Sequence, residues 1–376
     1  MAKKKKGDDS KLLCLVLFLS GLIQTDASFG VGGGVGVGIG GGVVGGGGVW
    51  IGGGNGNTVP TTAPSSAVYN ALQAWKAAIT EDPSGVLKTW VGSDVCSYKG
   101  VFCSGQSITA IDLNHANLRG VLVKDLAYLS DINILHLNSN RFYGQVPESI
   151  KDLDSLQELD LSNNRLSALF NKRLDAIFLN NNQFEGEIPG NLGNSPASVI
   201  NLANNKFSGE IPTSFGLTGS RVREVLLLNN QLTGCIPESV GMFSEIEVFD
   251  VSHNSLMGNV PDTISCLSEI EILNLAHNRF SGEVPDLVCS LRSLINLTVS
   301  FNFFSGISSE CSRVSFGFDF AGNCIPGRNS QRPEPDCSGY SGGGISCFRT
   351  PVQPLACAAI SIGLKEKFSR YTSSHP

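Results

Sequence analysis

A repeating unit of about 24 residues is the feature that most limits what this chain can fold into. From Ile108 to Gly306 the sequence returns to the pattern L-x-x-L-x-L-x-x-N-x-L-x-G-x-I-P, with other apolar residues at some of the leucine positions. The asparagine position is occupied by Asn140, Asn164, Asn182, Asn205, Asn230, Asn254, Asn278 and Asn302. A sustained period of this length predicts a solenoid, in which no repeat buries its core alone and neighbouring repeats stabilise one another.

Each recurring residue has a physical role in such a solenoid. Apolar positions such as Leu159 and Leu161 alternate with polar ones, which predicts a short strand with one buried and one exposed side. Stacked strands then form a parallel sheet that lines a concave surface. The asparagine can donate to and accept from the buried backbone at the bend after the strand. Nine repeats over residues 107–306 therefore predict an α/β solenoid, a horseshoe of the leucine-rich-repeat type.

The segments on either side of the repeats are typical of caps. Residues 66–106 form the expected N-terminal cap, which begins with an amphipathic helix over 66–80 that carries Leu72 and Trp75 on its apolar face. Trp90 and the pair Cys96 and Cys103 close this unit. Residues 307–376 form the expected C-terminal cap and tail, which is rich in cysteine.

The first residues predict the compartment. Lysines at positions 3–6 and 11 precede an apolar run over 12–23 and small residues near 27, which is typical of a secretory signal peptide over residues 1–27. The apolar run is too short for a membrane span. Residues 28–65 are a glycine-rich segment and linker with too few apolar side chains to form a core.

Charge and cysteine content agree with export. Without residues 1–27 the chain has 22 Lys and Arg against 30 Asp and Glu, a balance that argues against nucleic acid as a partner and favours basic ones. Ten of the 11 cysteines lie outside the signal peptide, and in an oxidising compartment we expect disulfides rather than metal or cofactor sites. Cys266 and Cys289 lie almost one repeat apart, which predicts a bridge between them, whereas the partner of Cys235 stays open.

Particular motifs resemble the leucine-rich-repeat extensins of plant cell walls. They are the segment Glu81 to Trp90 with Cys96 to Cys103, the segment Ile134 to Phe142, the segment Leu174 to Phe178 and the segment Phe249 to Asn254. The shortened turn after Leu166 fits the same family. The resemblance covers about residues 66–340, although the sequence contains no Ser-Pro-Pro-Pro-Pro array of the extensin kind.

The resemblance implies a secreted protein of the plant cell wall, or apoplast, with a role in wall integrity during growth. It further implies that the repeat domain binds small, basic, cysteine-containing signalling peptides of the rapid-alkalinization type.

Several polar residues are candidates for a binding site on the concave face. Repeats of this kind usually bind there, and strands about ~4.8 Å apart bring carboxylates of successive repeats together. We expect a ligand-binding surface formed by Glu158, Asp160, Glu224, Asp250, His253 and His277. The two histidines occupy the same repeat position one turn apart, where they could bind a metal weakly, sense pH or simply be exposed. Asp175, Glu247 and Glu271 lie near the strand starts, and His136 has no evident partner.

Two further expectations concern chemistry. Asn296-Leu297-Thr298 is a glycosylation sequon, so we expect a glycan on Asn296. We expect no enzyme, because the sequence carries none of the familiar hydrolase, metalloprotease or kinase motifs. A shallow exposed sheet also offers little burial with which to raise the pKa of a general acid.

Three functions stay open from the sequence. One is a wall protein that binds signalling peptides. Another is an inhibitor of secreted wall-degrading enzymes of the polygalacturonase-inhibitor type. The third is a structural wall component in which the glycine-rich segment is adhesive. The identity of the ligand and the oligomeric state cannot be derived from these residues.

Overall fold

The computed structural model describes residues 66–167, 174–190, 192–194, 196–216, 221–307, 311, 317–340, 347 and 357. The expected signal peptide over 1–27 and the glycine-rich segment over 28–65 lie outside the described residues.

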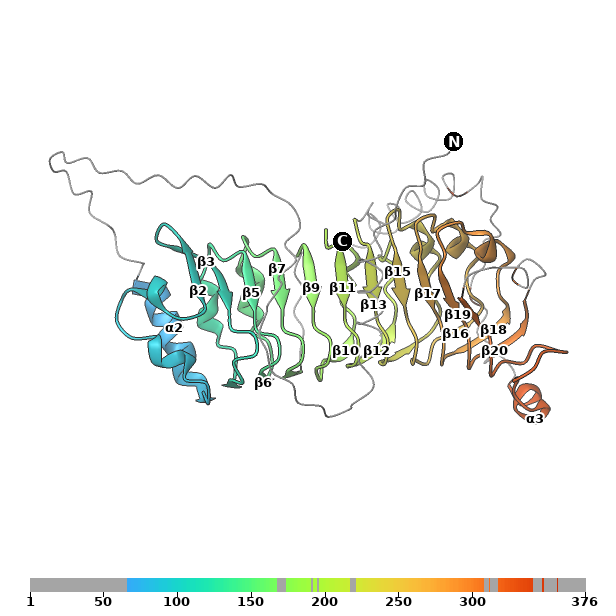
Figure 1. Ribbon diagram of the computed structural model, residues 1–376, viewed down its shortest axis with the longest axis horizontal. Coiled ribbons are helices and arrows are strands. Elements are labelled where there is room, and N and C mark those ends of the chain that lie inside the picture. The colour runs from blue at the N-terminus through green and yellow to red at the C-terminus, as the bar shows by residue number, and fades with distance from the viewer. Residues whose placement is uncertain are drawn as a thin grey trace, which may run out of the picture. The chain divides into compact units, whose positions relative to one another are not determined.

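A sheet of 11 strands runs through the repeats, with every strand after β3 parallel to its predecessor in the stack (Figure 1). Its strands are β2 (Val101–Ser104), β3 (Ser107–Asp112), β5 (Ile134–His136), β7 (Glu158–Asp160), β9 (Ala176–Phe178), β11 (Val199–Asn201), β13 (Glu224–Leu226), β15 (Val248–Asp250), β17 (Ile272–Asn274), β19 (Asn296–Thr298) and β21 (Gly317–Asp319). The strand order follows the chain, which confirms the predicted solenoid.

Three smaller sheets are formed by the short strands that follow the bends of successive repeats, together with β1 (Ile79–Glu81) of the N-terminal cap. They contain β1, β4 (Arg119–Gly120), β6 (Arg141–Gly144) and β8 (Arg165–Leu166); β10 (Glu185–Glu187), β12 (Lys206–Glu210) and β14 (Gln231–Thr233); and β16 (Met257–Gly258), β18 (Arg279–Glu283) and β20 (Phe303–Gly306).

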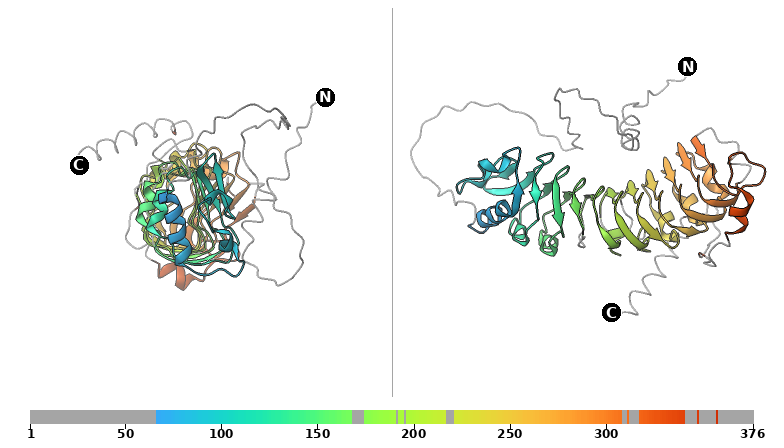
Figure 2. Two further views of the ribbon diagram at one scale, coloured as in Figure 1. Left: turned by 90° about the vertical axis from the view of Figure 1, so that its left-hand side faces the viewer. Right: turned by 90° about the horizontal axis from the view of Figure 1, so that it is seen from below.

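Short 3-10 helices occur in the N-terminal cap, as η1 (Val86–Thr89) and η2 (Val95–Ser97), and in the repeats, where they lie on the side away from the large sheet (Figure 2). The helices of the repeats are η3 (Lys124–Tyr128), η4 (Glu148–Asp152), η5 (Leu192–Asn194), η6 (Glu238–Met242), η7 (Asp262–Cys266) and η8 (Asp286–Ser290). A proline of the repeat stands directly before η4, η6, η7 and η8, because its fixed φ suits a helix entrance and its missing N–H is not needed there.

The core is one continuous column of leucine, isoleucine, valine and phenylalanine between the large sheet and the 3-10 helices. In the large sheet, the middle residue of each three-residue strand from β5 to β19 is buried, as for Leu135, Leu159 and Leu273. Burial of a leucine side chain stabilises the fold by roughly 1.5–3 kcal/mol. Repetition of this small contribution along the stack accounts for the stability of units that are unstable alone.

The N-terminal cap starts with α2 (Ser66–Ala78), which buries Leu72 and Trp75 as the sequence predicts. The helix ends two residues earlier than expected, since residues 79–81 turn into β1 and pair antiparallel with β4. Gly120 of β4 is required for this pairing, because a Cβ there would lie 2.5 Å from the carbonyl oxygen of Ala78. Glu81 then joins the cap to the repeats through ion pairs of 2.8 Å with Arg119 and 2.7 Å with Arg141.

The repeated asparagines form a ladder that joins successive repeats. Asn254 Oδ1 accepts the N–H of Leu232 at 3.0 Å, and its Nδ2 donates to the carbonyl oxygens of Leu227 and Val251, both at 3.0 Å. The bonding expected of the repeat asparagine is therefore confirmed. The ladder continues one step beyond the last predicted repeat, where Asn323 Oδ1 accepts the N–H of Phe304 at 3.1 Å.

Five disulfides join the ten cysteines outside the expected signal peptide. They are Cys96–Cys103, Cys235–Cys347, Cys266–Cys357, Cys289–Cys311 and Cys324–Cys337. The expected bridge between Cys266 and Cys289 is wrong. Cys289 is buried within η8, one position out of step with Cys266, which ends η7 and is partly exposed. The two thiols therefore do not meet, although their helices are neighbours.

Candidate functional site

The solvent side of the 11-stranded sheet, here called the concave face, presents the first and third residue of each short strand. Successive strands pair without a shift from β5 to β21, so these residues form two straight rows across the repeats. The third-residue row runs Asp112, His136, Asp160, Phe178, Asn201, Leu226, Asp250, Asn274, Thr298 and Asp319.

Four residues near the N-terminal end of these rows form what we call the acidic cluster: Asp112, His136, Glu158 and Asp160. His136 lies between Asp112 and Asp160 in the same row. Its Nε2 lies 2.8 Å from Glu158 Oε1. His136, which has no evident partner in the sequence, is thus paired across adjacent strands.

The pairing shifts the pKa values of both His136 and Glu158. The hydrogen bond that His136 donates to Glu158 raises the pKa of His136 against the opposing effect of burial, and the charges of Glu158, Asp160 and Asp112 raise it further. The same bond lowers the pKa of Glu158. Even with His136 protonated, the cluster carries three carboxylates against one imidazolium, so it stays anionic.

The His136–Glu158 pair has a testable pH dependence. A raised histidine pKa contributes stability that is complete below its ordinary 6.5 and is lost as pH rises through the folded value. A lowered glutamate pKa contributes stability that is complete above its ordinary 4.5 and is lost as pH falls. The pair is therefore fully effective between these two values.

We expect an NMR titration to give His136 a pKa above 6.5, and Glu158→Gln to bring it back down because the strongest charge-stabilising partner is gone. A wild-type pKa at or below 6.5, or one that does not respond to the substitution, would contradict the pairing.

An apolar patch borders the acidic cluster in the middle of the concave face. It consists of Ala176, Phe178, Val199 and Leu226, all half-buried. Glu158 pairs in register with Ala176, and Asp160 with Phe178, so the cluster and the patch are continuous. This patch is not among the surfaces predicted from the sequence. Its signal is the presence of apolar residues at the outward strand positions 176, 178, 199 and 226, where polar residues are usual.

Glu224 and Asp250, two further acids predicted for the binding surface, differ in how deeply they are buried. Glu224 is half-buried beside Val199, and burial followed by the charge of Glu247 raises its pKa. Asp250 is fully buried, which corrects the expectation of an exposed carboxylate. Its oxygens accept from the backbone and hydroxyl of Ser252 at 2.9 and 2.7 Å and from Asn274 Nδ2 at 2.9 Å. Asp250 therefore stabilises the bend after β15, and its carboxylate is not accessible to a ligand on the concave face.

The acids expected near the strand starts lie at the edge of the same face. Asp175 is exposed, whereas Glu247 and Glu271 are half-buried. Glu247 lies 3.6 Å from Arg223 of the preceding repeat, a distance typical of a weak, solvent-screened ion pair.

The two repeat histidines stack on one another beside the concave face. The rings of His253 and His277 lie 4.1 Å apart, and Phe301 continues the stack 4.3 Å from His277. All three residues have left-handed backbone, with φ of 52°, 53° and 55°. Burial, and then the charges of His253 and Arg332, lowers the pKa of His277.

This geometry does not support the metal-binding alternative. Near-parallel rings direct their nitrogen lone pairs side by side rather than toward one point, as metal coordination requires. Within the part of the chain that the structure describes, no group of three or more His, Cys, Asp and Glu side chains is arranged to hold a metal ion.

The glycosylation sequon lies on the concave face as well. Asn296 is exposed on β19, and its Oδ1 accepts from the hydroxyl of Thr298 at 3.0 Å. A glycan at this position stays a prediction.

Comparison with known proteins supports the repeat assignment. The family "Leucine rich repeat N-terminal domain" matches residues 69–104, and "Leucine Rich Repeat" matches residues 155–172, 198–217 and 269–291. Leucine-rich repeat extensin-like protein 2 of Arabidopsis thaliana is 41% identical over 220 residues, which cover 49% of this chain and 28% of that protein. Leucine-rich repeat extensin-like protein 6 of the same plant is 42% identical over 222 residues, covering 49% and 47%.

Solved structures agree on the fold. The ectodomain of the plant receptor kinase GASSHO1/SCHENGEN3 from Arabidopsis thaliana, in complex with CASPARIAN STRIP INTEGRITY FACTOR 2, superposes with a TM-score of 0.63 at 28% identity over 69% of this chain and 32% of the receptor. The plant peptide hormone receptor RGFR1 in complex with RGF2 gives 0.53 at 26% identity, over 55% and 34%.

The chain thus spans less than half the length of the two extensin-like relatives. Among the described residues, no helix is long and apolar enough to cross a membrane. The repeat domain of this chain is therefore a plant leucine-rich-repeat solenoid related to that of the leucine-rich repeat extensin-like proteins.

Proposed function

We propose that the concave face binds a small, basic, cysteine-containing secreted peptide in the plant cell wall, and that the protein acts in wall growth or integrity without catalysing a reaction. The observation that carries this proposal is the continuity of the acidic cluster with the apolar patch on one exposed sheet. The two surfaces together offer a partner both charge complementarity and apolar contact.

Charge complementarity requires that the partner carry positive charge. The acidic cluster is anionic, and a long-range negative potential from the whole chain, whose formal net charge is −6, raises the association rate of cations. Glu224 lies across the apolar patch from the cluster. A lysine or arginine of the partner placed beside it would bring its raised pKa down and favour the charged form.

Apolar contact supplies affinity that charge alone cannot. Exposed ion pairs contribute about 0–1 kcal/mol each, whereas an apolar side chain buried against Phe178 and Leu226 contributes roughly 1.5–3 kcal/mol. We therefore expect a folded peptide with basic residues beside an exposed apolar or aromatic side chain. A disulfide-bonded peptide fits, since its rigidity lowers the entropy lost on binding.

Two comparisons support this assignment by analogy. RGFR1 and GASSHO1/SCHENGEN3, which share the solenoid at 26% and 28% identity, were solved with RGF2 and CASPARIAN STRIP INTEGRITY FACTOR 2 respectively. The extensin-like relatives and the five disulfides support an extracellular location in the cell wall.

Calorimetry of the disulfide-bonded chain with a panel of basic, cysteine-containing plant peptides tests the proposal. We expect at least one peptide to bind, with an affinity that falls as salt rises because exposed charges are screened beyond about 8 Å at physiological ionic strength. If no peptide binds while the chain inhibits a secreted polygalacturonase, the proposal fails and the inhibitor function replaces it.

A further inference from the structure

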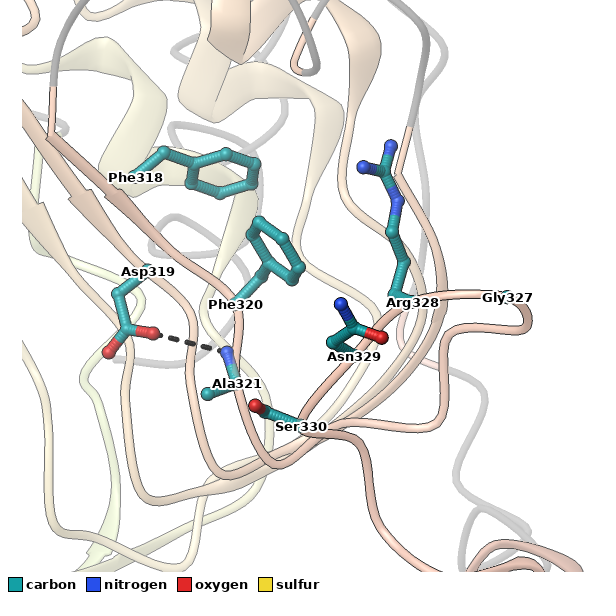
Figure 3. Close-up of a pocket in the computed structure, with 8 residues that line it drawn as sticks. All are labelled: Phe318, Asp319, Phe320, Ala321, Gly327, Arg328, Asn329 and Ser330. Carbon is teal, nitrogen blue, oxygen red and sulfur yellow. Dashed lines mark hydrogen bonds between the residues drawn. The ribbon is translucent and has the colours of Figure 1, made fainter.

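A pocket of about 380 Å³ lies at the last strand of the large sheet, away from the acidic cluster. It is formed by β21 with the residues that follow it and by the turn over residues 327–330 (Figure 3). Its size falls at the lower end of the range for small-molecule sites, about 300–1,000 Å³.

One wall of the pocket is aromatic. Phe318 pairs in register with Leu297, which is fully buried, so it occupies a core position of the repeat. Because β21 ends the sheet among the described strands, Phe318 and Phe320 are only half-buried. Their ring centres lie 5.2 Å apart with a tilt of 50°, and together they present apolar faces to the pocket.

The opposite wall is polar. Figure 3 shows the side chains of Arg328 and Asn329 across the pocket from the two rings, with Ser330 below them. The guanidinium carbon of Arg328 lies 5.6 Å from the ring centre of Phe320. Asp319 at the rim accepts the N–H of Ala321 at 3.1 Å.

The polar wall is held in place by the protein itself. The Ser330 carbonyl accepts from Gly322 N at 2.6 Å, and Gln331 Nε2 donates to the carbonyl oxygens of Asn329 at 3.0 Å and Phe320 at 3.4 Å. The Cys324–Cys337 disulfide encloses the whole turn. The two walls are therefore preorganised, which lowers the entropy lost when a ligand enters.

A ligand in this pocket contacts aromatic rings on one side and hydrogen-bonding side chains on the other. A pyranose sugar has this form, with an apolar C–H face and hydroxyls around its edge. A purely apolar group would bury the amide of Asn329 and the hydroxyl of Ser330 without partners, at about 1–3 kcal/mol each. We propose that this pocket is a second binding site, which takes an oligosaccharide by packing the apolar faces of its pyranose rings against Phe318 and Phe320.

Titration of the full disulfide-bonded chain with cellotetraose and with tetragalacturonate, followed by calorimetry and saturation-transfer NMR, tests this site. We expect one of the two sugars to bind. Phe320→Ala should weaken it about tenfold because a stacking surface is lost, and Asn329→Ala severalfold because a hydrogen bond is lost. Phe102→Ala, which removes an exposed ring on β2, should have no effect.

Two outcomes would overturn the site: neither sugar binds at millimolar concentration, or binding survives both Phe320→Ala and Asn329→Ala. Asn329 is exposed in a turn, so its substitution stays informative even if Phe320→Ala prevents folding. The result is independent of the peptide proposal, because charge reversal in the acidic cluster leaves this pocket intact.

Discussion

Reversing both Glu158 and Asp160 to lysine is expected to weaken the binding of a basic peptide by roughly 30- to 150-fold, or about 2–3 kcal/mol. The two carboxylates lie on one strand of the concave face and border the apolar patch. Reversal replaces two attractive contacts with repulsive ones and leaves the apolar surface in place. Calorimetry at low and physiological salt should show the loss, with a smaller salt dependence of what binding remains.

The chain contains a closely matched control. Glu185 and Glu187 have the same spacing on the three-residue strand β10 and are exposed, but they belong to a different sheet. Their double reversal to lysine changes the net charge equally and should alter affinity only slightly. Equal losses for the two pairs would mean that net charge alone governs binding. Strong binding that ignores Glu158 and Asp160 would move the site elsewhere on the chain.

Asn254→Ala is expected to destabilise the fold by about 1–3 kcal/mol, which lowers the melting temperature of a domain of this size by roughly 2–12 °C. The substitution removes bonds to four backbone groups of two successive repeats and leaves the N–H of Leu232 without its side-chain acceptor. Because stability in a solenoid depends on contacts between neighbouring repeats, the loss weakens both adjoining interfaces. Thermal unfolding of the disulfide-intact chain measures it, and Asn230→Ala should behave alike because it makes the same bonds one repeat earlier.

Asn296→Ala is the control for this effect, because its exposed side chain has one bond within the protein, from the hydroxyl of Thr298. The control and Asn254→Ala should be compared in protein produced without glycosylation. Equal melting temperatures for the two variants would contradict the role assigned to the ladder.

The sequence could not predict which carboxylates of the concave face are accessible to solvent. Glu158 and Asp250 both occupy outward positions of three-residue strands, yet one is paired with a histidine of the preceding strand and the other is buried beneath its neighbours. The difference depends on side chains some 22 to 24 residues away. A single repeat contains no information about which of its neighbours will stand beside it in the stack.

The repeat itself was determined by sequence alone. Leucine alternation, the asparagine ladder and the cap helix depend on local conformation and on a period that recurs within 24 residues, so strands, sheet order and core positions followed from the pattern. Tertiary structure alone decided the cysteine partners, the His136–Glu158 pair, the extension of the ladder to Asn323 and the join between the acidic cluster and the apolar patch. These contacts join residues far apart in the sequence. Their geometry depends on how the repeats stack, because a displacement of one position separates two thiols or buries a carboxylate.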